Sequence, residues 1–171
     1  MTKGKSARAI GREGATLAVA ILLLVPVAMS ALWLLTALGV QTADHAGAPN
    51  DPKCKGTAAC FSDRVRHIVD GDTLDVGLTR VRLALVNTPE AGLPGYAEAK
   101  QFTVQTCPVG LMALVDEDDG QARGSYGRTV GLVYCSGVNL NAASLSSGNA
   151  VLVPYYCNVS EFASETWTGC P

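Results

Sequence analysis

The sequence predicts a mainly β domain of the α+β class, a small barrel of five short strands with two or three short helices, preceded by one transmembrane helix. Three observations support this prediction. From residue 64 onward, short strand-like segments alternate with turn signals. A helical stretch separates the third strand candidate from the fourth. An uncharged, apolar run fills residues 15–40.

The apolar run is long enough to span a membrane. A transmembrane helix needs about 20 predominantly apolar residues, and leucine, valine, isoleucine and alanine dominate residues 15–40. Pro26 is compatible with this, because prolines are tolerated inside transmembrane helices. Residues 1–14 carry four basic residues and one acidic residue, and positive charge stays on the cytoplasmic side. We therefore expect a cytoplasmic N-terminus, a signal-anchor helix and an extracytoplasmic remainder.

A cleavable signal peptide is the alternative, with small residues near Ala46 and Ala48 as its cleavage site. The apolar core of a signal peptide usually runs over about 7–15 residues, so the longer run favours a retained anchor. In both hypotheses the same domain is exported. A retained anchor leaves it membrane-anchored, and a cleaved signal peptide makes it a secreted protein.

Cysteine usage agrees with export. All six cysteines follow the apolar run, and an even set confined to an exported segment indicates disulfides. A metal site built from them is the weaker alternative, because the sequence has no C-x-x-C pair and only two histidines, His45 and His67. Six cysteines allow 15 pairings, and the sequence does not choose among them.

The exported part begins with a polar linker at residues 41–59 and continues as one domain at residues 60–171. Residues 64–69, 73–76 and 79–86 are the first three strand candidates, with turn signals between them. A strand's side chains alternate between its two faces, so every second residue of these segments is a core candidate.

A helix is predicted at residues 97–106, which are rich in Ala, Glu, Lys and Gln. It ends before Pro108, because the residue that precedes a proline avoids helical angles. Residues 111–115 and 129–134 are the fourth and fifth strand candidates. The acidic run at residues 116–119 is predicted to be a solvated loop, since it lacks the D-x-D-x-D-G spacing of a calcium loop.

A second helix is predicted to start at an Asn141 N-cap, to run through Ser147 and to end at Gly148. Five strands with a helix between the third and the fourth predict a small closed barrel with helices outside it, of the OB type. His67 is predicted to be a surface or packed strand histidine, since no serine or cysteine partner pattern accompanies it.

Three short clusters carry the polar chemistry: residues 69–73 (V-D-G-D-T), residues 82–90 (R-L-A-L-V-N-T-P-E) and residues 126–128 (Y-G-R). Each alone has an ordinary explanation, such as a D-G hairpin turn or a solvated arginine. Together they supply hard oxygen ligands, namely Asp72, Asn87 and the Thr88 carbonyl. Oxygen ligands without histidine or thiolate suit calcium or magnesium better than zinc.

The same clusters supply one further carboxylate, Glu90, and two guanidinium groups, Arg82 and Arg128. Paired arginines match phosphate oxygens and stabilise charge that develops at phosphorus. A carboxylate placed to accept a proton from water completes a hydrolytic site. The combination predicts hydrolysis of phosphodiester bonds.

D-G-D-T, then R-x-x-x-V-N-T-P-E, then Y-G-R, in this order and at these intervals, resemble the motifs of the staphylococcal nuclease (thermonuclease) family. The resemblance covers about residues 64–156, including the helix at residues 96–103 and the N-A-A-S-L segment that starts at Asn141. D-G-D-T alone is a weak signal, whereas three clusters in order are a specific one.

The resemblance implies an OB-type barrel that hydrolyses DNA or RNA to 3′-phosphate products, with calcium as cofactor and no obligate protein partner evident. The matching residues fall into four groups: Asp72, Asn87 and the Thr88 carbonyl bind calcium, Glu90 orients or deprotonates the attacking water, Arg82 and Arg128 bind the scissile phosphate, and Tyr126 and Tyr156 help to hold the terminal phosphate of the nucleotide.

The sequence departs from the family pattern at three places. Asn87 stands where the founding member has aspartate, so we expect weaker calcium binding. Pro154 replaces a tyrosine that lies near the base. The family's long C-terminal helix has no room in the tail at residues 157–171, which carries two cysteines. We expect disulfides to replace the packing of that helix, each worth about 2–4 kcal/mol.

The charge of the exported part keeps a second function open. Of the 13 Lys and Arg residues, four lie within the first 40 residues, as does one of the 15 Asp and Glu residues, which leaves 9 against 14 and a net charge of −5. Domains that grip nucleic acid non-specifically are usually basic. The alternatives are therefore a catalytically silent OB-type module that binds nucleic acid or protein at the membrane, and a disulfide-stapled structural domain.

Overall fold

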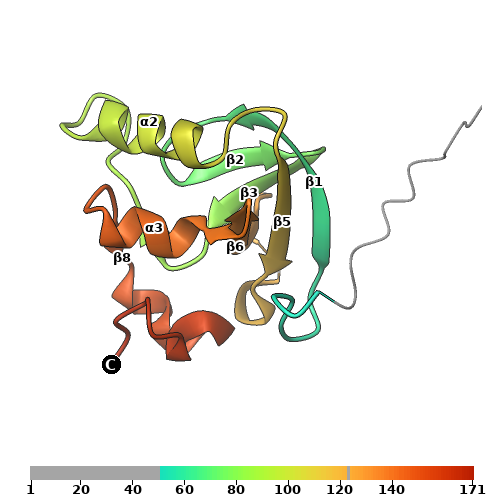
Figure 1. Ribbon diagram of the computed structural model, residues 1–171. Coiled ribbons are helices and arrows are strands. Elements are labelled where there is room, and N and C mark those ends of the chain that lie inside the picture. Colours follow the sequence, from blue (N-terminus) through green and yellow to red (C-terminus); the bar gives the residue numbers. More distant parts are fainter. Residues whose placement is uncertain (1–50, 123) are drawn as a thin grey trace, which may run out of the picture. The chain divides into compact units, whose positions relative to one another are not determined.

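The computed structural model describes residues 51–122 and 124–171 (Figure 1). The predicted cytoplasmic segment, the predicted membrane anchor at residues 15–40 and most of the predicted linker at residues 41–59 lie outside the described residues. Within the described part of the chain, no helix is both long and apolar enough to cross a membrane.

A closed barrel of five strands forms the body of the domain, as predicted. The strands are β1 (Cys60–Ile68), β2 (Thr73–Val76), β3 (Thr79–Leu83), β5 (Met112–Glu117) and β6 (Thr129–Cys135). They pair antiparallel in the order β3-β2-β1-β5-β6, and a parallel pairing of β3 with β6 closes the barrel. Short strands β4 (Val86–Asn87) and β8 (Val151–Leu152) pair with each other, and β7 (Val138–Asn139) extends the sheet beside β6.

Two α-helices, α2 (Tyr96–Thr106) and α3 (Leu140–Ser146), lie beside each other against the barrel (Figure 1). The predicted first helix is confirmed: it ends at Thr106, and its C-cap Cys107 immediately precedes Pro108. The described residues also form three short 3-10 helices: η1 (Asp119–Gln121), η2 (Pro154–Asn158) and η3 (Glu161–Ser164).

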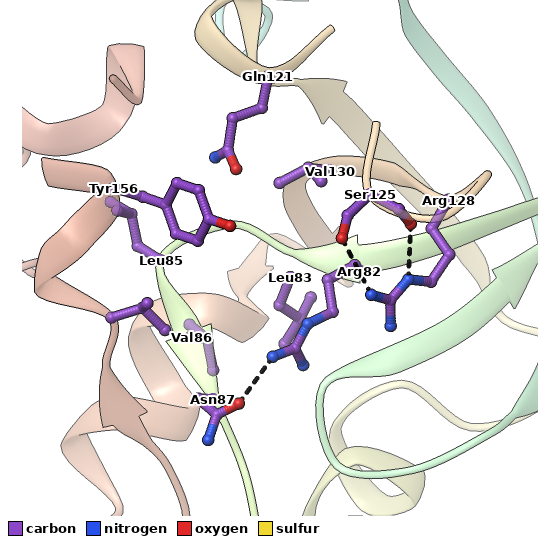
Figure 2. Close-up of a pocket in the computed structure, with 11 residues that line it drawn as sticks. Arg82, Leu83, Leu85, Val86, Asn87, Gln121, Ser125, Arg128, Val130 and Tyr156 are labelled. Atoms are coloured by element: carbon purple, nitrogen blue, oxygen red, sulfur yellow. Dashed lines mark hydrogen bonds between the residues drawn. The ribbon is translucent and has the colours of Figure 1, made fainter. Parts of the chain in front are cut away.

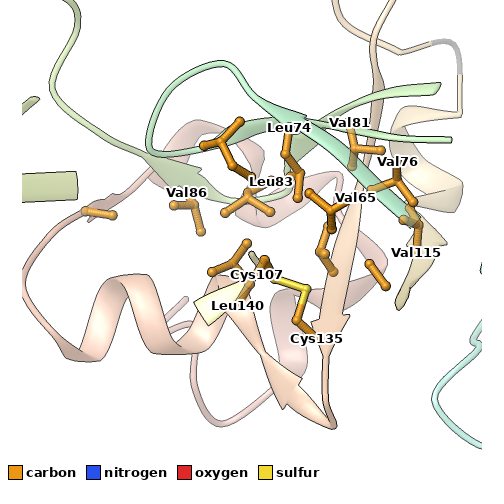
Figure 3. Close-up of a cluster of buried hydrophobic side chains, with 14 residues drawn as sticks. Val65, Leu74, Val76, Val81, Leu83, Val86, Cys107, Val115, Cys135 and Leu140 are labelled. Atoms are coloured by element: carbon orange, nitrogen blue, oxygen red, sulfur yellow. A yellow bond between two sulfur atoms is a disulfide. The ribbon is translucent and has the colours of Figure 1, made fainter. Parts of the chain in front are cut away.

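The barrel core consists mainly of alternate strand residues, most of them β-branched or leucine, with Leu140 of α3 packed among them (Figure 3). Its labelled members include Val65, Leu74, Val81, Leu83 and Leu140. β-branched side chains pack well on a pleated sheet, which explains their choice here. His67 remains exposed on β1, next to Asp75, which agrees with the prediction of a surface histidine.

Three disulfides confirm the interpretation of the cysteines: Cys54–Cys60, Cys107–Cys135 and Cys157–Cys170. The second one joins the end of α2 to β6 within the barrel core (Figure 3). The third closes the C-terminal tail on itself, and η3 places Phe162, which is fully buried, in a second apolar cluster. The other buried residues of this cluster are Ala84, Leu85, Val130 and Leu132.

The prediction of one continuous strand over residues 79–86 is wrong. β3 ends at Leu83, and Leu85 adopts a left-handed backbone conformation with φ 64° before β4 begins. This bend lets the Leu85 side chain enter the second apolar cluster while Val86 enters the barrel core. Leu85 and Val86 are thus buried in two different clusters, and this burial outweighs the regular alternation of side chains along a single strand.

The prediction that Asn141 caps the second helix is also wrong. Asn139 is the N-cap, because its side chain accepts a hydrogen bond from Ala142 N at 3.0 Å. Asn141 is buried inside the helix, and its amide group bonds the main chain of three residues, Ala84, Gly131 and Val133. It thus satisfies buried main-chain groups at the bend after β3. Gly148 ends the helix as predicted, with φ 76°.

The acidic run at residues 116–119 is not a solvated loop. Asp116 and Glu117 belong to β5, and both Asp116 and Asp118 are fully buried. Asp118 accepts hydrogen bonds from the main-chain N–H groups of Gly120 and Glu161, each at 3.1 Å. Asp118 therefore fastens the C-terminal tail to the barrel, and of the four acidic residues only Asp119 is exposed.

Asp116 is a buried carboxyl group with an incomplete set of partners. Its Oδ2 accepts a hydrogen bond from Lys55 N at 2.9 Å, whereas Oδ1 has no partner within the described residues. Burial raises the pKa of Asp116 to about 6, from an ordinary value of 3.8. A carboxyl group whose folded pKa is raised binds more protons in the folded state, so stability falls as the pH rises from about 4 to about 6.

Replacing Asp116 with asparagine should therefore stabilise the domain above pH 6. The expected gain is on the order of 2–3 kcal/mol at pH 8 and close to zero at pH 4, because the protonated acid already carries no charge. Urea unfolding of the oxidised protein at the two pH values measures it. Asp119→Asn is the control, since this exposed carboxylate has a lowered pKa, caused first by the Ala58 N–H, and should gain nothing. A gain that does not depend on pH would contradict the assignment.

Candidate active site

Residues of the second and third polar clusters of the sequence line one cleft of about 190 Å³ (Figure 2). Its floor is apolar, with Leu83, Val86 and Val130 among its residues. Its polar residues come from β3, β4, η1, the segment before β6 and η2: Arg82, Asn87, Gln121, Ser125, Arg128 and Tyr156. The bend after Leu83 brings Arg82 and Asn87 to the same end of the barrel.

Asp72 lies just before β2, beside this cleft, and is 3% exposed. Its Oδ2 accepts a hydrogen bond from Thr88 N at 2.7 Å. Gly71 permits this approach, because a Cβ there would lie 2.8 Å from Thr88 Oγ1 and from the Ala99 methyl group. The D-G-D motif therefore serves close packing as well as polar chemistry.

Arg82 bridges two of the predicted metal ligands. Its Nη1 forms an ion pair with Asp72 Oδ1. Its Nη2 donates to Asn87 Oδ1 at 2.9 Å (Figure 2). Burial lowers the pKa of the Arg82 guanidinium below its usual value, and the positive charge of Arg128 lowers it further. The charge of Glu90 acts in the opposite direction, so Glu90 lies within electrostatic reach of Arg82.

Arg128 is held by the segment that precedes it. Its Nε donates to the Ser125 carbonyl at 3.0 Å, and its Nη2 donates to Ser125 Oγ at 3.1 Å (Figure 2). No carboxylate within the described ranges forms an ion pair with Arg128. Its charge is therefore free to attract an anion in the cleft.

The remaining predicted site residues lie at different distances from the cleft. Thr88 is buried next to Asp72, and Glu90 is exposed on the turn after Pro89. Tyr156 lines the cleft and is 36% exposed. Tyr126 is 99% exposed and does not line the cleft, and the Arg128 guanidinium carbon lies 6.0 Å from its ring centre.

Three residues contribute to the site although their roles were not predicted from the sequence. Ser125 orients Arg128, and Gln121 lines the cleft. Asp70 accepts a hydrogen bond from Asp72 N at 3.1 Å, and its charge acts on Arg82. The signals were present, since Asp70 opens D-G-D-T and Ser125 directly precedes Y-G-R, but neither position suggests a role without the fold.

The donor atoms at this site fit calcium. Asp72 supplies carboxylate oxygens, Asn87 an amide oxygen and Thr88 a main-chain carbonyl, all of them hard ligands. The Arg82 guanidinium now contacts the oxygens of Asp72 and Asn87, so an ion that uses both residues must displace it. Within the described ranges, one group of His, Cys, Asp and Glu side chains has the spacing of a metal site, but two of its three members are the disulfide-bonded Cys54 and Cys60, which offer no thiolate.

Comparison with known proteins adds an independent observation. The sequence profile described as staphylococcal nuclease homologue matches residues 80–165, just over half of the 171 residues. The chain belongs to the staphylococcal nuclease family. The matched range contains most of the predicted site residues but not Asp72, which precedes it.

A relative from this comparison is an uncharacterized protein of Bacillus anthracis. It is 32% identical to the chain over 98 residues, which cover 52% of this chain and 46% of the Bacillus anthracis protein. The chain thus spans about half the length of that relative. Membership of the staphylococcal nuclease family identifies a nuclease-like domain, and the barrel with its two helices fits that family's fold.

Proposed function

We propose that this domain is a calcium-dependent nuclease that hydrolyses phosphodiester bonds of DNA, RNA or both to 3′-phosphate products. The observation that carries the proposal is the cleft in which Arg82 and Arg128 both lie beside the oxygen-bearing Asn87. Family membership supports the same chemistry. The net negative charge of the exported part is compatible with a nuclease, because Arg82 and Arg128 supply positive charge within the cleft.

The two arginines have distinct roles in the proposal. Arg128, which no carboxylate within the described residues neutralises, binds the phosphate and stabilises the negative charge that grows on its oxygens during attack. Arg82 contacts Asp72 and Asn87 and lines the same cleft, so it links the metal ligands to the phosphate. Tyr156, on the cleft wall, offers a ring face and a hydroxyl group to the nucleotide. Tyr126 is left at the edge, where a longer substrate can reach it.

Glu90 is the proposed general base. It is exposed on the turn after Pro89 and within electrostatic reach of Arg82, so it can take a proton from water that approaches the phosphate. Asp72, Asn87 and the Thr88 carbonyl would hold calcium. The ion would neutralise charge on the phosphate and favour ionisation of water.

The proposal also assigns a location. Three disulfides within the described residues indicate an oxidising environment. We propose that residues 15–40 anchor the chain in a membrane and that residues 1–14 stay in the cytoplasm. The linker at residues 41–59 then leads to the domain at residues 60–171, which acts outside the cytoplasm. Cleavage after the apolar run would make the same domain a secreted one.

A catalytically silent binding module is the second candidate. The observation that favours it is the Arg82 guanidinium, which contacts the oxygens of both Asp72 and Asn87. Asn87 carries no charge to compete for calcium against this arginine.

A nuclease assay separates the two candidates. The full-length oxidised protein in mild detergent is incubated with single-stranded DNA or RNA and with calcium, magnesium or a chelator. Calcium-dependent cleavage that Arg128→Ala abolishes, and that exposed Arg66→Ala preserves, supports the enzyme. Substrate binding without cleavage at millimolar calcium favours the binding module.

Replacing Asn87 with aspartate should tighten calcium binding, by roughly tenfold, because the affinity of oxygen sites follows the number of charged ligands. Isothermal titration of calcium into the protein measures the effect without any need for turnover. Asn149→Asp, which adds the same charge outside the proposed ligand set, is the matched control. An unchanged dissociation constant for Asn87→Asp would mean that residue 87 is not a ligand.

A further inference from the structure

A second cleft adjoins the candidate active site at β4. It encloses about 370 Å³, and the residues that matter for its chemistry are Asn87, Thr88, Pro89, Leu93, Asn149 and Val151. Asn87 lines both clefts, and its neighbour Thr88 lines the second. The two clefts therefore meet at the residues that are proposed to hold calcium.

The walls of the second cleft are apolar, and main-chain pairing holds the segments that carry them. Leu93 and Val151 are 57% and 63% exposed, so apolar surface faces solvent here. Asn87 pairs with Val151 between β4 and β8, and Leu93 N donates to the Glu90 carbonyl at 3.0 Å. The space is at the lower end of the volumes, about 300–1,000 Å³, that hold small ligands. Apolar walls with two side-chain amides, Asn87 and Asn149, suit the sugar and base of a nucleoside.

The position of Glu90 decides which nucleoside the second cleft can take. A phosphodiester carries one nucleoside on each side, and Tyr156 on the wall of the first cleft offers a ring face to one of them. In-line displacement places the attacking water opposite the leaving oxygen. Leu93 N donates to the Glu90 carbonyl, so the turn that carries the proposed base also lines the second cleft, and we take this cleft as the side of attack. The leaving nucleoside then belongs in the first cleft.

We propose that the second cleft binds the sugar and base of the nucleoside that keeps the phosphate after cleavage. This inference rests on the proposed nuclease function and deepens it, because it identifies a second substrate subsite of the same active site. It predicts that a dinucleotide is a much better substrate than a nucleotide ester that fills the first cleft alone.

Kinetics on two substrates test the subsite. A double variant, Leu93→Ser with Val151→Ser, removes both exposed apolar walls. For the full-length oxidised protein, KM for a dinucleotide should rise about tenfold, as expected when apolar contacts leave a pocket. The kcat and KM for the methyl ester of a nucleoside 5′-phosphate should not change. Leu78→Ser, at a site 97% exposed on the β2–β3 turn, is the matched control. An equal loss on both substrates, or no loss on either, would overturn the proposal.

A binding experiment tests the subsite independently of turnover. A nucleoside 3′-phosphate is titrated into methyl-labelled protein and followed by NMR. We expect shifts at the methyl groups of Leu93 and Val151, whereas a nucleoside 5′-phosphate should shift Val153 in the first cleft. If no substrate is cut but the 3′-phosphate shifts Leu93 and Val151, the nuclease proposal fails and the nucleoside site stands. Shifts by the 3′-phosphate in the first cleft alone would overturn the site.

Discussion

Replacing Arg128 with alanine is expected to lower kcat by roughly 10²–10³ while the melting temperature stays within about a degree, the size of effect that follows loss of one transition-state donor. The two effects separate because of the contacts of this residue. Arg128 bonds only Ser125, three residues away, and no ion pair joins it to the rest of the barrel within the described residues. Its removal therefore leaves the fold intact and takes one positive charge from the cleft.

The conservative variant sharpens this prediction. Arg128→Lys keeps the charge but loses the planar group that can bind two phosphate oxygens, so it should recover only part of kcat. Arg66→Ala, an exposed arginine of β1, should keep full activity. Initial rates at saturating substrate and calcium, together with a thermal melt of each variant, are the measurements. A fully active Arg128→Ala protein would remove this residue from the mechanism.

Replacing Phe162 with alanine is expected to destabilise the domain by about 3–5 kcal/mol, the usual cost of deleting a fully buried phenylalanine. Phe162 is 0% exposed and belongs to the cluster that holds Leu85 and Leu132. That cluster also supports the bend between Arg82 and Asn87. We therefore expect the variant to lose calcium affinity as well, at temperatures where it remains folded.

The Cys157–Cys170 disulfide tests the same tail by a different route. It closes a loop with a sequence separation of 13 residues, and such loops contribute about 3 kcal/mol in the chain-entropy account. Replacing both cysteines with alanine should lower the free energy of unfolding without changing the packing of Phe162. Urea unfolding of the two variants, singly and combined, measures both effects. If the cysteine pair contributes nothing, the idea that disulfides replace the family's C-terminal helix is wrong.

The barrel was accessible from sequence because its signals are local. The second strand lies at Thr73–Val76 and the first helix at Tyr96–Thr106, each within one residue of the range predicted. Turn signals and the proline at position 108 set those boundaries through the main-chain angles they allow. The three polar clusters could be found for a related reason, since each is contiguous in sequence.

The wrong predictions concern residues whose conformation depends on distant partners. Leu85 leaves the strand geometry because Phe162, far along the chain, provides the cluster that buries it. Asn141 is not a cap because main-chain groups of the barrel need its amide. Asp116 is buried because β1 and β6 flank its strand. In each case the free energy of burial and of satisfying buried polar groups exceeds a local preference of about 1 kcal/mol.

The sequence by itself determined that this protein is a disulfide-bonded barrel of the staphylococcal nuclease family that carries a group of oxygen-bearing side chains and two arginines in three short clusters. Only the tertiary structure decided the pairing of the cysteines, the bridge that Arg82 makes between Asp72 and Asn87, and the outward position of Tyr126. The reason is physical: residue type and spacing along the chain define which chemical groups are present. Which of those groups meet depends on the closure of β3 against β6, a contact between segments far apart in sequence.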